Sequence, residues 1–170
     1  LLPSLTLNGR YTYAYDHLKT EKYYDRSTSI GQSYKGQAFL SHEENVKHQI
    51  EGVATYHPKM EGKHDIKITA GTSYIYQKGK GDEVQAYGFA SDVFSFKNIG
   101  AAQHLDWIGS GESSVKKASV FGRAEYIFNN RYIINGSVRA DGSSVFGADY
   151  RWGIFPAGSL AWHLGEESFM

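Results

Sequence analysis

The chain has 170 residues, and its mean hydropathy of −0.47 argues against a membrane-spanning helix, which needs about 20 consecutive apolar residues. Acidic and basic residues number 18 each, so we expect no basic surface dense enough to bind a nucleic acid. The lack of cysteine excludes disulfides, thiolate metal ligands and a cysteine nucleophile. Aromatic residues make up 15% of the chain and proline only 3 positions, a composition typical of strand-rich proteins.

Six segments alternate apolar and polar residues, a pattern that predicts strands with two different faces. Each is about twice as long as the ~5–6 residues of a typical globular strand and is close to a tilted membrane strand. Tyrosines lie near the ends of these segments, where a membrane–water interface favours amphipathic rings. The predicted strands are residues 5–16, 46–56, 66–76, 118–128, 132–141 and 154–163.

The connections between these strands alternate strictly between long and short. Residues 16–44 and 77–117 are long, 142–153 is intermediate, and 57–65 and 129–131 are short. A three-residue loop at 129–131 would pair Phe128 with Tyr132 and Tyr126 with Ile134, which keeps like faces together. Outer-membrane barrels have this asymmetry between short periplasmic turns and long outer loops.

These patterns predict an all-β fold: an antiparallel transmembrane β-barrel segment of about six long strands, with short periplasmic turns and long extracellular loops. A soluble antiparallel β module that binds a ligand remains an alternative, because it also needs one apolar face. A passive outer-membrane barrel is a second alternative.

The C-terminal segment carries a compound motif. Arg131-Tyr132 opens one strand, which leads into Arg139-Ala140-Asp141-Gly142-Ser143-Ser144-Val145-Phe146-Gly147. The next strand carries Trp152-Gly153-Ile154-Phe155-Pro156 and Ser159-Leu160-Ala161-Trp162, followed by Glu166-Glu167-Ser168-Phe169. Residues 121–170 therefore resemble the barrel of SusC/RagA-type TonB-dependent transporters. Val145 and His163 stand where that family commonly has Arg.

The resemblance implies that residues 1–170 are part of a longer barrel, incomplete at both ends and without its plug domain. It implies a bacterial outer-membrane protein that imports glycan or peptide nutrients. We also expect no enzyme activity and no cofactor, because the residues form no catalytic constellation. The resemblance also implies four partners: a SusD-type surface lipoprotein, the TonB complex acting through the plug, outer-membrane lipid and the substrate.

Aromatic residues in the long loops are candidate substrate contacts, because sugar rings stack on aromatic faces. The alternative is that these rings pack the loops against the barrel or a partner. We also expect Ser91 to cap a single helical turn within residues 88–96. The candidates are Tyr87, Phe89, Phe94, Phe96 and Trp107.

Four charged residues, Arg123, Glu125, Arg139 and Asp141, fall on the polar face of neighbouring predicted strands. In a barrel this face borders the lumen, where the side chains could contact the plug. The alternative is a solvated ladder of charges.

No catalytic constellation is present. His57 and His64 flank one turn, but their spacing matches no zinc motif, so we predict no metal site. Gly79-Lys80-Gly81 and Gly109-Ser110-Gly111 lack the strand–helix context of a phosphate-binding loop and are expected to be flexible loops.

Overall fold

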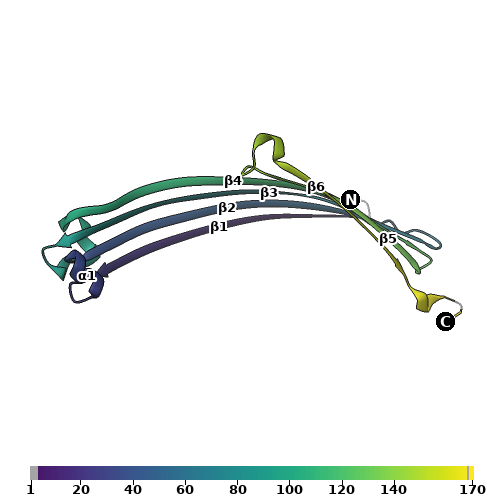
Figure 1. The fold of residues 1–170 in the computed structure, drawn as a ribbon. Coiled ribbons are helices and arrows are strands. Elements are labelled where there is room, and N and C mark those ends of the chain that lie inside the picture. Colours follow the sequence, from purple (N-terminus) through teal and green to yellow (C-terminus); the bar gives the residue numbers. More distant parts are fainter. Residues whose placement is uncertain (1–3, 168) are drawn as a thin grey trace. The chain divides into compact units, whose positions relative to one another are not determined.

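The computed structural model describes residues 4–167 and 169–170, so Ser168 of the C-terminal motif lies outside the described residues. Six antiparallel strands form one sheet in which the spatial order follows the chain, β1-β2-β3-β4-β5-β6 (Figure 1). No helix in these residues is both long and apolar enough to cross a membrane. The elements are β1 (Leu5–Tyr24), α1 (Ser29–Tyr34), β2 (Gln37–Tyr56), β3 (His64–Phe89), η1 (Asp92–Ala101), β4 (Ala102–Phe128), β5 (Tyr132–Ser143), η2 (Ala148–Tyr150), β6 (Trp152–Trp162) and η3 (Leu164–Glu166).

The first four strands are much longer than predicted. β3 has 26 residues and β4 has 27, so most of the expected loops 16–44 and 77–117 is strand. Only residues 25–36 and 90–101 connect these strands at the long-loop end. The prediction was wrong here because polar and charged residues occur on both faces of the added segments, so their apolar residues, such as Leu105, Trp107 and Ile108, do not alternate regularly.

The chain divides into two compact units. The first comprises Leu1–Tyr13, His48–Tyr76 and Val115–Met170, and the second comprises Ala14–Lys47 and Gln77–Ser114. The first unit contains almost all of the segments predicted as membrane strands. The second contains the strand extensions and their two connections.

In the first unit, the predicted tight turn and its register are confirmed. Phe128 lies opposite Tyr132 and Tyr126 opposite Ile134. Asn129 and Asn130 adopt positive φ values of 52° and 56°, a conformation that Asn tolerates better than most residues. The Arg131 amide closes the turn by donating to the Phe128 carbonyl at 3.0 Å.

One face of the first unit carries apolar and aromatic side chains. At the short-turn end, the rings of Phe128, Tyr132 and Trp162 stack in a row with centroids 6.4 and 6.2 Å apart. Tyr76 and His48 mark the other end of this face, with ring centroids 6.4 Å apart. From His64 to Tyr76, β3 covers about 40 Å at ~3.3 Å per residue, which a tilt of ~45° reduces to roughly the 30 Å of a bilayer core.

The second unit has a small core at its connections. Ala38, Ala86 and Phe89 are at most 3% exposed. The amides of Gly88 and Phe89 donate to the carbonyls of Gly36 and Lys35 at 3.1 and 2.9 Å, which ties the end of β3 to the β1–β2 connection. Gly36 has a φ of 86°, and a Cβ there would lie 2.5 Å from the Tyr23 hydroxyl, so glycine is needed at this close approach.

Candidate functional site

The four predicted charged residues lie on one face of the first unit. Arg139 donates to both carboxylate oxygens of Asp141, at 2.9 and 2.7 Å, and to the Ser119 hydroxyl at 3.1 Å. Arg123 donates to Glu125 at 3.3 Å and to the Asn135 amide oxygen at 3.1 Å. The structure therefore organises these residues as two separate ion pairs, one around each arginine.

A cavity of about 460 Å³ lies between the two arginines on this face. Phe121, Lys67 and Ser137 also line it. The Phe121 ring covers the backbone of Gly71, where an added Cβ would lie 2.4 Å from the ring. The polar face thus places the Phe121 ring beside Lys67 and Arg139, and Phe155 lies opposite Arg139 on the next strand.

The predicted aromatic residues do not form one cluster. Phe89 is 2% exposed and packs edge-on against Tyr23 with centroids 5.4 Å apart, so its ring belongs to the core. Tyr87 stacks on His104 at 4.9 Å. Both Tyr87 and Phe89 lie in β3 rather than in a loop.

The other three aromatics lie further along the chain. Phe94 and Phe96 lie in η1, and Phe94 is 49% exposed. Trp107 lies in β4 and is 54% exposed, so a ligand can reach its indole ring. The Ser91 cap is confirmed, since its hydroxyl accepts from the Val93 amide at 3.3 Å. The capped segment is longer than a single turn because η1 continues to Ala101, with non-helical backbone at Ser95 and Asn98.

The carboxylate of Asp92 in η1 joins the end of β1 and the β1–β2 connection through a hydrogen bond and an ion pair. The Tyr23 hydroxyl donates to Asp92 at 2.7 Å, and Arg26 lies 3.4 Å from the same carboxylate. Burial, together with the neighbouring Asp92 carboxylate, raises the pKa of Tyr23 to about 12. Tyr23 therefore remains a hydrogen-bond donor at every physiological pH.

His57 and His64 line one cavity but have different hydrogen-bond partners. His57 lies 2.7 Å from Asp65, whereas His64 lies 2.7 Å from the Tyr126 hydroxyl. Within the described ranges, no group of three or more His, Cys, Asp or Glu side chains is placed to hold a metal ion.

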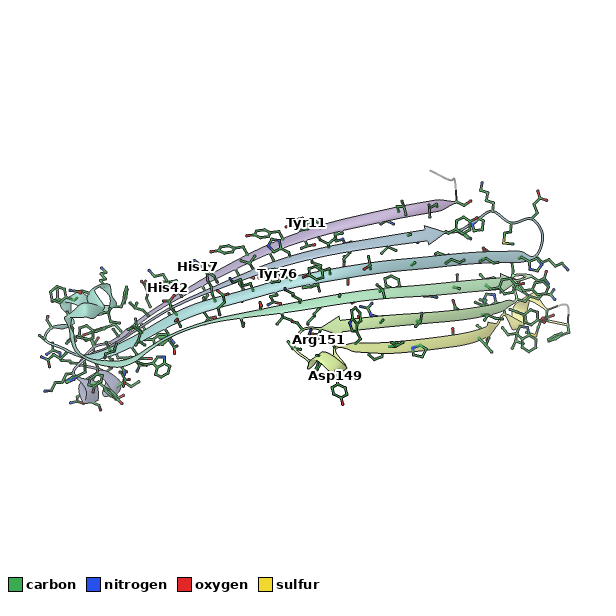
Figure 2. The ribbon with its side chains drawn as sticks, turned by 90° about the horizontal axis from the view of Figure 1, so that it is seen from above. Tyr11, His17, His42, Tyr76, Asp149 and Arg151 are labelled. Carbon is green, nitrogen blue, oxygen red and sulfur yellow. The ribbon has the colours of Figure 1, made fainter. Side chains whose placement is uncertain are left out.

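Sequence reasoning missed a set of paired charges in the strand extensions. Lys80 pairs with Glu44 at 2.7 Å and Lys78 with Glu112 at 2.8 Å. His42 lies 3.2 Å from Asp82, and its ring stacks on His17 of the neighbouring strand (Figure 2). These residues occupy alternate positions, as in a strand, and that regular spacing of charges was the available signal.

The glycine-rich segments Gly79-Lys80-Gly81 and Gly109-Ser110-Gly111 lie within β3 and β4. The expectation of flexible loops was wrong. A strand without side chains on one face still forms its backbone ladder, and the alternate residues Lys80 and Ser110 carry the side chains.

A single sheet of long strands, which in the first unit is apolar on one face and charged on the other, is typical of the wall of an outer-membrane β-barrel. The chain is 31% identical to TonB-dependent receptor P39 of Formosa agariphila over 122 residues, which is 72% of this chain and 12% of that protein. It is 48% identical to the TonB-dependent receptor SusC of Bacteroides thetaiotaomicron over 52 residues, which is 31% of this chain and 5% of SusC. The chain belongs to the SusC/RagA-type TonB-dependent receptors of the bacterial outer membrane.

Among solved structures, the fold is similar to that of the RagAB peptide transporter. The TM-score is 0.87 at 21% identity, over 99% of this chain and 19% of that chain. The chain thus spans less than a fifth of the length of each of these relatives. No family model matches the chain. The matched proteins are receptors and transporters rather than enzymes.

Proposed function

We propose that this chain forms part of the barrel wall of an outer-membrane TonB-dependent active transporter that imports glycan or peptide nutrients. One observation carries the proposal: in the first unit, the same strands present an aromatic-bounded apolar face on one side and paired charges on the other. Lipid favours the first face, and a water-filled or plugged lumen favours the second.

On this proposal, Arg123, Glu125, Arg139 and Asp141 face the lumen and contact a plug domain supplied elsewhere in the full-length receptor. The cavity between the arginines supports this role, because it offers Phe121 and Lys67 to an incoming side chain. The TonB complex would pull on the plug, and a SusD-type lipoprotein would cover the extracellular end.

The long-loop end would be extracellular, and its accessible aromatics would contact the substrate. Phe94 and Trp107 are the strongest candidates because both rings are about half exposed. Phe96 and Tyr87 would contribute from partly buried positions, and Phe89 would support them from the core.

The test is nutrient uptake by a strain that lacks the full-length receptor. Labelled oligosaccharides and labelled tryptic peptides are supplied separately, with and without a protonophore. We expect loss of uptake of one mixture in the deletion strain and in energy-depleted cells. Uptake that depends on the receptor but survives energy depletion would indicate a passive barrel, and unchanged uptake in the deletion strain would reject the proposal.

A further inference from the structure

A groove of about 410 Å³ lies on the second unit. Residues at odd-numbered positions of β2, β3 and β4 form most of it, among them Ser41, Glu43, Glu83 and Trp107. None of the described residues that line it is Lys or Arg. The groove is therefore an acidic site with one aromatic ring.

The odd-numbered positions of these strands share one face of the sheet. A Cβ added at Gly79 would lie 2.8 Å from the Asn45 amide oxygen and 3.6 Å from the Ser113 hydroxyl. Residues two apart in a strand point to the same side, so these side chains line one face of the second unit. On the proposed function the long-loop end is extracellular, so a substrate can reach this groove.

The Trp107 indole lies over the bare backbone of Gly109. A Cβ at Gly109 would come within 3.0 Å of the indole nitrogen and 3.2 Å of two ring carbons, so glycine makes this position possible. The side chain remains 54% exposed, which leaves ring surface open to a ligand. An indole face is the best of the aromatic surfaces for binding a cation.

Two carboxylates beside this ring have no cationic partner. Neither Glu43 nor Glu83 makes an ion pair within the described part of the chain, although several strand charges nearby are paired. Ser41 is only 7% exposed, and its hydroxyl makes no hydrogen bond to any described residue. No buried side-chain oxygen of the described residues lacks a hydrogen-bond partner, so the Ser41 hydroxyl is accessible at the groove wall and can accept a hydrogen bond from a ligand.

We propose that this groove binds the Lys or Arg side chain of a peptide substrate, an inference that rests on the proposed transport function. The cationic group would lie over Trp107, pair with Glu43 and Glu83, and donate a hydrogen bond to Ser41. A neutral glycan would leave both carboxylates uncompensated, and an acidic ligand would be repelled.

The experiment measures calorimetric binding of three probes to the full-length receptor in detergent: a decapeptide of alternating lysine and glycine, its glutamate–glycine counterpart, and maltoheptaose. We expect binding of the lysine peptide alone, weakened by added salt. Trp107→Ala, Glu43→Gln and Glu83→Gln should each weaken it roughly 2- to 5-fold, and the double glutamine variant about tenfold. Glu61→Gln, an equal charge change outside the groove, should leave it unchanged.

Tighter binding of the glutamate peptide or of maltoheptaose, no binding of any probe, or equal affinity in the groove variants and Glu61→Gln would each overturn the proposal. A variant that loses the heat-shifted band of a folded barrel does not count as a test of binding. In that case Glu43→Asp is measured instead, because it keeps the carboxylate. We expect Glu43→Asp to retain the affinity for the lysine peptide. The uptake experiment is independent of this result. If uptake depends on the receptor and on energy, but the groove variants bind the lysine peptide as well as Glu61→Gln does, the groove site is rejected and the transport function is retained.

Discussion

At the residue scale, single side chains hold the connections of this sheet in place. The Thr28 hydroxyl caps α1 by accepting from the Gly31 amide at 3.0 Å. A Cβ at Gly31 would lie 1.9 Å from the Asp25 carbonyl oxygen, so no other residue fits there without a backbone shift. Such local requirements explain why the connections at the long-loop end are compact rather than flexible.

Replacing Tyr23 tests the link between these connections. Tyr23→Phe removes the 2.7 Å hydrogen bond to Asp92 and should weaken the link by about 1.5–3 kcal/mol, as for a bond to a charged group. Trypsin should then cleave the full-length receptor faster after Arg26. Tyr34→Phe, whose ring instead packs on Tyr87, is the control and should cleave at the wild-type rate. Equal cleavage of both variants would show that the hydrogen bond does not hold the connection.

Glu167 predicts a pH dependence of stability. The Trp162 indole and the Tyr132 hydroxyl donate to its carboxylate at 3.1 and 3.0 Å and lower its pKa below the ordinary value. The folded state thus favours the charged form. This stabilisation is complete above the unfolded pKa of ~4.3 and is lost as pH falls through the lower folded pKa.

We therefore expect Glu167→Gln to lower the urea midpoint of the full-length receptor at neutral pH and to flatten its decrease in acid. Glu166→Gln serves as the neighbouring control and should behave as wild type. A Glu167→Gln receptor with the wild-type pH profile would contradict the assignment.

At the scale of elements, strand length and turn chemistry act together. β4 and β5 are joined by a turn with two consecutive positive φ values, which sets the register that places Arg123 opposite Ser137 and Phe121 opposite Arg139. The position of the charges on the polar face therefore depends on this turn as well as on alternation.

Asn130→Val should destabilise the hairpin by about 1–2 kcal/mol, because a β-branched residue disfavours the left-handed conformation at a φ of 56°. Asn130→Gly should be tolerated, because glycine adopts this conformation without steric cost. The unfolding free energy of the full-length receptor in urea measures both. Equal values for Val and Gly would show that the turn does not require this backbone conformation.

At the scale of the whole molecule, the sheet of the described residues is open, with β1 and β6 as its edges. Each unpaired backbone group in lipid costs several kcal/mol. We therefore expect that residues 1–170, exported alone with a signal peptide, give no heat-shifted band near 19.0 kDa in the outer membrane. The full-length receptor should give such a band at a much larger size, and a heat-shifted monomer of the short chain would contradict the need for further strands.

The sequence by itself determined the six strands, their antiparallel order, the Phe128–Tyr132 register and the family. An apolar face must alternate with a polar one, and a three-residue turn permits only one register that keeps the faces separate. The motif of residues 131–169 is dense enough to identify the family without a structure.

Only the tertiary structure decided how far the strands extend and which aromatics are buried. It alone also places Glu43, Glu83 and Trp107 around one groove. In the extensions both faces carry polar and charged residues, so no regular hydrophobic periodicity marks the strands, which are formed by backbone hydrogen bonds between neighbouring strands. The sequence gives no reason to separate Phe89 from Trp107, since both were predicted to be loop aromatics. In the structure Phe89 is buried in the core, whereas the Trp107 ring lies over Gly109 and is accessible. Such differences depend on neighbours far apart in the chain, and those neighbours are set only when the strands pair.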